Sequence, residues 1–372
     1  MKKSLALGFL VFFFGLSTPL IAQSTQQQAL LVLSKGAHTL AIVDPSDLRV
    51  IARVPVGNDP HEVIASTDGQ TAYVSNYGFG AFNTLAVVDL VHQQALPSID
   101  LGPLRGPHGL AFAGNKVWFT AEAAKAIGSY DPASKKVDWI MGTGQNRTHM
   151  IFVAANLQSI VTTNVSSATV TIIEKSTRRS PGGPPPGMPG ANGSLRPGPP
   201  PGAPRQGPPG GRPGGGPMGA PGGDWDETVI PVGNGSEGFD VSPSGAEIWV
   251  ANAQDGTISI IDRAGKKVIQ TLSANLQSAN RLKFTLDGKL VLISSLGGPD
   301  VAVYDAATRK EVKRIPVGHG AAGIVMQPDG SRAFVACSPD NYVAVIDLKT
   351  LEVAGKIDAG EEPDGIAWAT RP

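Results

Sequence analysis

The residues of this 372-residue chain whose types and spacing suggest chemistry are three histidines, His61, His108 and His149. His61 and His108 each follow a proline and open the apolar runs "PHEVIAST" and "PHGLAFA", and His149 opens the similar run "THMIFVAA". Neutral imidazole is a ligand that borderline divalent metals such as Zn²⁺, Cu²⁺ and Fe²⁺ accept. The three histidines therefore predict a divalent metal site, provided that the fold brings them together.

The same place in the apolar run recurs four more times along the chain. Carboxylates occupy two of these places, and a carboxylate beside a metal-activated water can serve as its acid or base. Glu237 and Asp364 are therefore the candidate catalytic residues if the protein is an enzyme. The four residues are Glu237, Asn280, Ala322 and Asp364.

Further polar residues lie near this repeated position in the sequence. Arg147 precedes His149 and Arg281 follows Asn280, so these two cations either clamp an anionic ligand or pair with Glu237 and Asp364. His319 lies in a loop that feeds the same face of the predicted fold. Together with Asn280, these three residues are the candidate ligand-binding residues.

A repeat supplies the elements that must position these side chains. An alternating apolar run that ends in an acid occurs seven times, as in "TLAIVD", "TLAVVD" and "TISIID". The intervals between the acids are 45, 42, 43, 88, 43 and 42 residues, so one unit carries 45 extra residues (88 − 43). We expect the acids to cap turns by accepting hydrogen bonds from backbone N–H groups. They are Asp44, Asp89, Asp131, Glu174, Asp262, Asp305 and Asp347.

Each unit contains four short apolar runs separated by turn residues, which is typical of a propeller blade. The sequence therefore predicts an all-β fold over residues 29–372, a seven-bladed β-propeller with four antiparallel strands per blade. The repeat begins with a lone second run, "ALLVLSK", and ends with a lone first run, "PDGIAWAT". Joining them completes one blade from three N-terminal strands and one C-terminal strand. Such a 3+1 seam leaves no open sheet edge.

In a propeller the first strand of each blade lines the central channel, so the repeated position forms a ring at the channel mouth. Sheets about 10 Å apart give this ring a radius on the order of 8–11 Å. A histidine reaches roughly 6 Å from its Cα and a metal–nitrogen bond adds about 2 Å, so three neighbouring imidazoles can converge on one ion. The alternative is that the ring holds only water or bonds to loop carbonyls.

We expect the runs "AYVSN", "IWVAN" and "AFVAC" to be second strands. The phrases "SPSG" or "QPDG" stand before such a run, and "IPVG" follows the preceding acid-ending strand. In these motifs the chain resembles the YVTN family of β-propeller repeat proteins, over nearly all of residues 29–372 apart from the insert. The resemblance implies the propeller fold. It implies no single function, because members of that family do many different things.

Two segments fall outside the repeat. Lys2 and Lys3 precede an apolar run and the phrase "STPLIAQ", which predicts a signal peptide over residues 1–22 and a periplasmic or secreted protein. An uncleaved anchor is the alternative. Residues 180–223 are rich in Pro and Gly, so we expect a disordered insert within the third blade. Its arginines leave two interpretations, an arm for anionic polymers or a tolerated loop expansion.

The composition excludes several classes of protein. A formal net charge of zero argues against a nucleic-acid-binding surface. Cys337 is the sole cysteine, so neither an internal disulfide nor covalent c-type haem is possible. An exported chain without disulfides must rely on a large core or on ring closure. A closed ring needs no partner for stability, so we expect a monomer. We also expect no transmembrane span once the signal peptide has been cleaved.

Two function classes follow from these observations. In the favoured one, the protein is an exported module that binds a small molecule, or an envelope or extracellular protein, at the channel mouth. In the alternative, it is a metal-dependent hydrolase, lyase or oxidoreductase with the three histidines as metal ligands. A metal-free hydrolase that resembles lactonases is a third interpretation, and the fold alone does not choose among them.

Overall fold

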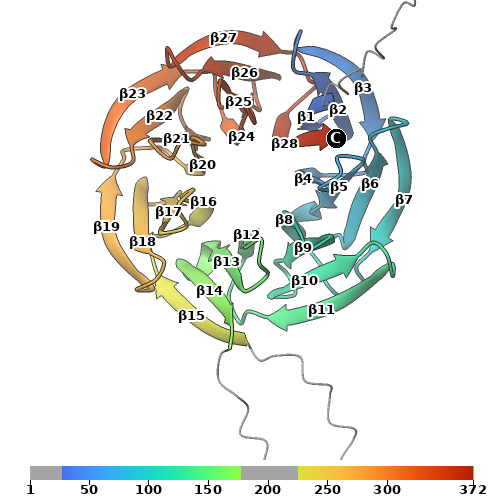
Figure 1. Ribbon diagram of the computed structural model, residues 1–372, viewed down its shortest axis with the longest axis horizontal. Coiled ribbons are helices and arrows are strands. Elements are labelled where there is room, and N and C mark those ends of the chain that lie inside the picture. Colours follow the sequence, from blue (N-terminus) through green and yellow to red (C-terminus); the bar gives the residue numbers. More distant parts are fainter. Residues whose placement is uncertain (1–26, 177–224, 372) are drawn as a thin grey trace, which may run out of the picture.

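The computed structural model describes residues 27–176 and 225–371. Its 28 strands form seven four-stranded antiparallel sheets, which stand as blades around one axis (Figure 1). This arrangement confirms the predicted seven-bladed β-propeller. The predicted signal peptide (1–22) and the predicted insert (180–223) lie outside the described residues, the latter in the segment of chain that joins β14 to β15.

The blades are numbered from the first one whose four strands are continuous in sequence, and the strands of each blade run from the innermost to the outermost. Blade 1 contains β4 (Pro60–Ala65), β5 (Thr71–Asn76), β6 (Thr84–Asp89) and β7 (Gln94–Asp100), and blade 2 contains β8 (Pro107–Ala113), β9 (Lys116–Ala121), β10 (Ala126–Asp131) and β11 (Lys136–Gly142). Blade 3 contains β12 (Thr148–Val153), β13 (Ser159–Asn164), β14 (Thr169–Lys175) and β15 (Trp225–Pro231), and blade 4 contains β16 (Ser236–Val241), β17 (Glu247–Asn252), β18 (Thr257–Asp262) and β19 (Lys267–Ser273).

The remaining blades follow the same order. Blade 5 contains β20 (Ala279–Phe284), β21 (Leu290–Ser295), β22 (Asp300–Asp305) and β23 (Lys310–Pro316), and blade 6 contains β24 (Ala321–Met326), β25 (Arg332–Cys337), β26 (Tyr342–Asp347) and β27 (Glu352–Ile357). Blade 7 contains β28 (Pro363–Arg371), β1 (Gln27–Ser34), β2 (Thr39–Asp44) and β3 (Arg49–Pro55). Two single 3₁₀ turns, η1 (Gly78–Gly80) and η2 (Val165–Ser167), follow β5 and β13.

Blade 7 contains the predicted seam between the two ends of the chain. Its sheet order is β28-β1-β2-β3, with β28 antiparallel to β1 through pairs such as Leu30↔Trp368 and Val32↔Ile366. The ring is therefore closed by main-chain hydrogen bonds between strands more than three hundred positions apart, which confirms the 3+1 closure.

Burial follows the place of a strand within its blade. The second and third strands are covered on both faces by neighbouring blades, so β5 buries five of its six residues and β6 buries four. The outermost strand alternates, as in β3, because only one of its faces is covered. Apolar side chains such as Leu33 of blade 7 and Val74 of blade 1 form clusters between adjacent blades. The core therefore lies between the blades.

Five of the seven acids that end the third strands cap the turns that follow, as predicted. Asp44 Oδ1 accepts a hydrogen bond from the backbone N–H of Ser46 at 2.8 Å, and Asp347 Oδ1 accepts one from that of Lys349 at 2.8 Å. This use satisfies the turns and leaves no reason to assign these carboxylates to chemistry. Equivalent hydrogen bonds are made by Asp89, Asp131 and Asp305.

Four glycines let the innermost strands of neighbouring blades approach one another. A Cβ on Gly323 would lie 2.2 Å from the carbonyl oxygen of Asp364, far inside van der Waals contact. Gly109, Gly238 and Gly365 hold the same place in their blades and would meet a carbonyl oxygen of the next blade at 2.5, 2.3 and 2.4 Å. This close approach is possible because these positions carry no side chain.

We expect Gly323→Ala to lower the free energy of unfolding by ~3 kcal/mol, since the new methyl group overlaps the backbone of β28 and the rigid ring cannot relax freely. Gly142→Ala is the matched control, because a Cβ there meets nothing within 4 Å. Its effect should stay within about 0.5 kcal/mol. Urea unfolding of both variants is the measurement, and equal midpoints would contradict the close packing of β24 against β28.

Candidate functional site

The innermost strands β4, β8, β12, β16, β20, β24 and β28 surround the axis and are called the hub (Figure 1). The repeated position identified in the sequence is the second residue of each of these strands. At the hub the ring centres of His61 and His108 lie 4.9 Å apart, and those of His108 and His149 lie 3.8 Å apart. The structure therefore brings the three histidines together, and their role as metal ligands stays a prediction.

A second repeated position supplies more polar side chains. It is the residue directly after the second strand of each blade, which lies beside the start of the antiparallel first strand. In blades 7, 1 and 2 this residue is Lys35, Tyr77 and Glu122. In blades 3 to 6 it is Val165, Ala253, Leu296 and Ser338.

Residues at the second position contact the histidine of the next blade. Lys35 Nζ lies 3.0 Å from His61 Nε2, and Glu122 Oε1 lies 2.5 Å from His149 Nδ1. Contacts from blade 7 to blade 1 and from blade 2 to blade 3 thus follow one geometric rule. The rule arises because each second strand ends against the first strand of the neighbouring blade.

Tyr77 makes the equivalent contact between blades 1 and 2. Its ring packs edge-on against His108 with the ring centres 5.1 Å apart, and against His61 with the centres 4.9 Å apart. Its hydroxyl donates a hydrogen bond to Glu122 Oε2 at 2.5 Å. Burial and this carboxylate both raise the pKa of Tyr77, so the phenol is protonated at neutral pH. Tyr77 therefore ties the histidine cluster to Glu122.

His149 lies between two carboxylates. Its Nδ1 faces Glu122 Oε1 at 2.5 Å and its Nε2 faces Glu237 Oε2 at 2.7 Å. Burial alone would lower the pKa of His149, but Glu237 and Glu122 together raise it. Burial would likewise raise the pKa of Glu237, but His149, Arg281 and Arg147 lower it to about 2. The arrangement favours an imidazolium held between two ionised carboxylates.

His108 has the opposite electrostatic environment. Its side chain is buried, and burial together with the charges of His149 and His61 holds its pKa well below the usual range. The imidazole is therefore neutral. Within the described residues, its buried Nδ1 has no hydrogen-bond partner. Ligand atoms of His108, Glu122 and His149 lie within 4.8 Å of one another, which makes these three buried residues a candidate metal-binding group.

Sequence reasoning did not assign Lys35, Tyr77 or Glu122 to the site. Glu122 ends the run "VWFTAE", which indicated only a second strand. An alignment of the residues that follow the second strands places polar side chains on three consecutive blades. This pattern was present in the sequence. That it places these side chains beside the histidines becomes clear only when the end of one second strand is seen to meet the first strand of the next blade.

The candidate catalytic residues lie on either side of the histidines. Glu237 contacts Nε2 of His149 at 2.7 Å. Asp364 Oδ2 lies 3.5 Å from Lys35 Nζ, and burial raises the pKa of Asp364. Both carboxylates are in reach of the cluster, and their catalytic role stays a prediction.

The two candidate arginines are used differently. Arg147 lies 3.5 Å from Glu122 Oε2 through Nε and 3.8 Å from Glu237 Oε1 through NH2. Arg281 donates to Asn280 Oδ1 at 3.0 Å and to Glu62 Oε1 at 2.5 Å. Pairing with a carboxylate was one of the two alternatives for these cations, and Arg147 lies beside its expected partner Glu237. Arg281 pairs instead with Glu62, not with the expected Asp364. Clamping of an anion stays a prediction.

The loop that contains His319 was expected to lie on the same face of the ring as His61, His108 and His149. The contacts of His319 do not join it to these histidines. Its backbone N–H donates to Asp340 Oδ2 at 2.8 Å and its ring faces the same carboxylate. The side chain is 74% exposed. Among residues 27–176 and 225–371, the partner of His319 is thus a loop residue of its own blade 6.

Titratable residues gather in one sector of the hub. Blades 7, 1, 2, 3 and 4 supply lysine, tyrosine, histidine and carboxylate side chains at the two repeated positions, whereas blades 5 and 6 supply Asn280, Leu296, Ala322 and Ser338. Blade packing requires the same strands in every blade and does not require this asymmetry. The polar sector is therefore the feature of the fold that repetition does not explain.

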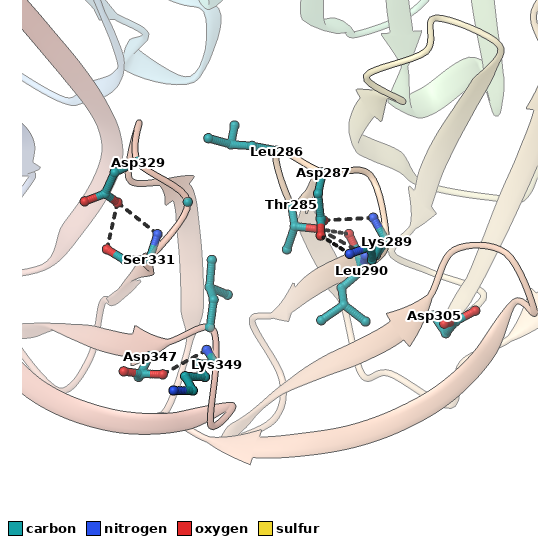
Figure 2. A pocket seen from close by; sticks show the side chains of 12 residues that line it. Thr285, Leu286, Asp287, Lys289, Leu290, Asp305, Asp329, Ser331, Asp347 and Lys349 are labelled. Atoms are coloured by element: carbon teal, nitrogen blue, oxygen red, sulfur yellow. Dashed lines mark hydrogen bonds and ion pairs between the residues drawn. The ribbon is translucent and has the colours of Figure 1, made fainter.

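The opposite face of the ring carries a groove of about 690 Å³ between blades 5 and 6. Figure 2 shows that its carboxylates turn toward their own loops, with Asp329 bonded to Ser331 and Asp347 bonded to Lys349. These acids already accept hydrogen bonds from their own turns, so they are less available to a ligand than the side chains of the hub. The hub is therefore the better candidate for a binding site.

In the described part of the chain the helical segments are two single 3₁₀ turns, so none has the length or hydrophobicity of a membrane-spanning helix. No family model and no curated protein matches the chain. Membership of the YVTN family therefore stays a prediction.

Solved structures share the fold. A functionally unknown protein from Desulfotomaculum acetoxidans is 12% identical with a TM-score of 0.67, and the match covers 92% of this chain and 98% of that one. Kuenenia stuttgartiensis hydrazine synthase is 17% identical with a TM-score of 0.63, covering 86% and 92%. A putative 6-phosphogluconolactonase from Bacteroides fragilis is 13% identical with a TM-score of 0.66, covering 93% and 99%. Identities this low show a common β-propeller fold, and these proteins differ in function.

Proposed function

We propose that the protein is an exported binding module that holds a divalent transition metal ion at its hub, through His108, Glu122 and His149. One observation carries the proposal. His108 is a neutral, buried imidazole whose Nδ1 has no hydrogen-bond partner among the described residues. One ring nitrogen of His108 also lies within 4.8 Å of a ligand atom of Glu122 and of His149. An unpaired buried polar atom is costly, and a metal ion would satisfy it.

The donor types suit the proposal. Two imidazole nitrogens and one carboxylate oxygen form a set that Zn²⁺ accepts in proteins, with a fourth position left for water or another ligand. His61 is the candidate for that fourth position. Two imidazoles on one zinc ion have ring centres about 5 Å apart, given Zn–N bonds of about 2.0–2.1 Å in a tetrahedral arrangement. The His61–His108 separation of 4.9 Å fits this value.

The His149 side of the site must open slightly to admit an ion. The His108 and His149 ring centres are 3.8 Å apart, about 1 Å closer than two imidazoles on one tetrahedral ion. Glu122 and His149 lie at hydrogen-bond distance, so the ion would replace the proton between them. A shift of this size is within the reach of side-chain rotation. Tyr77 donates to Glu122 Oε2, whereas His149 faces Glu122 Oε1, so the ion and the tyrosine would use different oxygens.

The test is a zinc titration of the mature chain, purified without an affinity tag. We expect one zinc ion per chain, and at least about a hundredfold weaker binding in His108→Ala, because each ligand supplies a large share of the binding free energy. The control is His92→Ala, a surface histidine whose partner is Asp89 on the far side of blade 1. Failure of the parent chain to bind zinc, or equal loss in both variants, would sink the proposal.

Export is part of the proposal and is supported by Lys2, Lys3 and the apolar run that follows them. We expect the purified protein to begin near Gln23, after removal of residues 1–22. Intact mass of the protein from the periplasmic or culture fraction is the measurement. A mass that retains Lys2 and Lys3 would favour the uncleaved anchor.

A metal-dependent hydrolase is the second candidate function. It is favoured by the donor set, which leaves a coordination position open, and by Asp364, a carboxyl group near His61 whose pKa burial raises. Ester or lactone hydrolysis by zinc-loaded protein that is lost in Asp364→Asn, with zinc binding retained, would support this function. Absence of hydrolysis in zinc-loaded protein would leave the binding module.

A further inference from the structure

The connection after β5 differs from the equivalent connection in every other blade. It spans residues 77–83, seven residues, whereas those after β1, β9, β13, β17, β21 and β25 span four residues each. Its sequence is "YGFGAFN". The extra length therefore adds two phenylalanines beside Tyr77, on the face of the ring where the histidine cluster lies.

Phe79 is held in a costly conformation. Gly78, Phe79 and Gly80 all have positive φ, at 55°, 51° and 86°. A glycine adopts this region freely, but a residue with a Cβ does so at a cost of roughly 1–2 kcal/mol. Because the two glycines absorb the rest of the bend, the strain falls on the aromatic residue.

Several contacts hold the loop in this shape. The backbone N–H of Gly78 donates to Asp59 Oδ2 at 2.8 Å, and Arg105 NH2 donates to the carbonyl oxygen of Ala81 at 2.9 Å. The ring of Phe82 covers Gly78, where a Cβ would approach it to 2.5 Å. The loop is therefore fixed on both sides, yet it leaves Phe79 88% exposed.

The ring of Phe79 is the outermost of three neighbouring rings, Phe79, Tyr77 and His108. Its ring centre lies 6.0 Å from that of Tyr77, which lies 5.1 Å from that of His108. Arg147 is a neighbour of Tyr77, since both residues contact the same oxygen, Glu122 Oε2. An apolar ring and a guanidinium group thus adjoin one residue at the surface of the polar sector.

The guanidinium of Arg147 has hydrogen-bonding capacity left. Its contacts with Glu122 and Glu237, at 3.5 and 3.8 Å, exceed the roughly 2.7–2.9 Å of a charge-assisted hydrogen bond. Its side chain is 44% exposed. A carboxylate from solution can therefore approach it and form the shorter, bidentate contact that arginine favours.

We propose that Phe79, Tyr77 and Arg147 form a binding site for an aromatic carboxylate, with its ring stacked on Phe79 and its carboxylate paired with Arg147. The inference deepens the proposed function, because the ligand would cover the same cluster that is proposed to hold the metal. It gives a use to a largely exposed aromatic residue on a loop that several contacts hold in place, an arrangement that lowers the entropy lost on binding.

The experiment is calorimetric titration of the mature protein with benzoate, and with cyclohexanecarboxylate and benzamide as matched probes that lack the aromatic ring or the charge. We expect benzoate to bind best. Phe79→Ala should weaken it about fivefold through loss of ring stacking, with Phe79→Trp retaining it. Arg147→Gln should weaken it about tenfold or more through loss of a charged hydrogen bond. Ile140→Ala, which removes an exposed apolar side chain from β11, is the control and should change nothing.

The titrations are run both with zinc and with a chelator, so that the two proposals can fail separately. Benzoate binding that depends on Phe79 and Arg147 in chelator supports the aromatic site even if no metal binds. Zinc binding without benzoate binding overturns the aromatic site and leaves the metal site standing. Equal affinity for benzoate and cyclohexanecarboxylate, or no change in Phe79→Ala, overturns the role of Phe79.

Discussion

Replacing Glu122 with Gln is expected to weaken zinc binding by the hub about a hundredfold or more, the share of one ligand in a zinc site. The substitution keeps the size of the side chain and removes its charge. Glutamine can still accept the hydrogen bond from Tyr77, so the fold of the β9–β10 connection should persist. The loss would therefore report the missing anionic ligand, and a zinc titration with a competing chelator measures it.

Glu237→Gln is the matched variant, because Glu237 contacts the other nitrogen of His149. Its role in the proposal is to orient His149 and to raise its basicity rather than to hold the ion. We expect about a tenfold loss of zinc affinity, which is the usual effect of removing a partner of a ligating histidine. Equal losses in the two variants, or a larger loss in Glu237→Gln, would show that the ion lies on the other side of His149.

Arg281→Met is expected to lower the free energy of unfolding by about 3–5 kcal/mol. Arg281 of blade 5 pairs with Glu62 of blade 1 at 2.5 Å, and the two blades stand on opposite sides of the axis (Figure 1). The side chains are only 13% and 15% exposed. Removing the arginine leaves a carboxylate without its partner inside the hub, where water does not compensate the charge fully.

The double variant Glu62→Leu, Arg281→Met separates the charge from the packing. We expect it to recover most of the lost stability, because replacing both members of a buried ion pair by apolar groups is often nearly neutral. Urea unfolding of the two single variants and the double variant gives the coupling between the residues. Additive losses would mean that the pair does not bridge the hub in solution.

The sequence determined the architecture of this protein. Seven acid-ending runs established the number of blades, since each interval holds one four-stranded unit and the intervals are nearly constant once the 45 extra residues of one unit are set aside. The unmatched runs at the two ends predicted the pairing of β28 with β1, because a second strand without a first leaves an open edge. The number of blades and the pairing of the end strands can be predicted from the sequence. Strand periodicity and turn residues are visible within a few residues, and edge pairing follows from the fixed length of the repeat.

The sequence also predicted part of the site. His61, His108 and His149 share one repeat position. In a ring of blades, residues at one repeat position lie at the same level around the axis, so those of consecutive blades are neighbours. Glu122 and Tyr77 escaped this reasoning because they belong to a different position, which meets the histidines only where the second strand of one blade ends against the first strand of the next. His319 was included because its loop feeds the right face, but its ring turns to Asp340.

Only the tertiary structure decided the chemical state of each group. His108 and His149 occupy the same repeat position, yet their pKa values shift in opposite directions. Two carboxylates raise the pKa of His149 against the effect of burial, whereas burial and the neighbouring positive charges lower that of His108. The partner of Arg281 lies across the axis on a blade distant in sequence. Proton affinity and ion pairing depend on distances of a few ångströms and on burial, and neither is encoded in the period of a repeat.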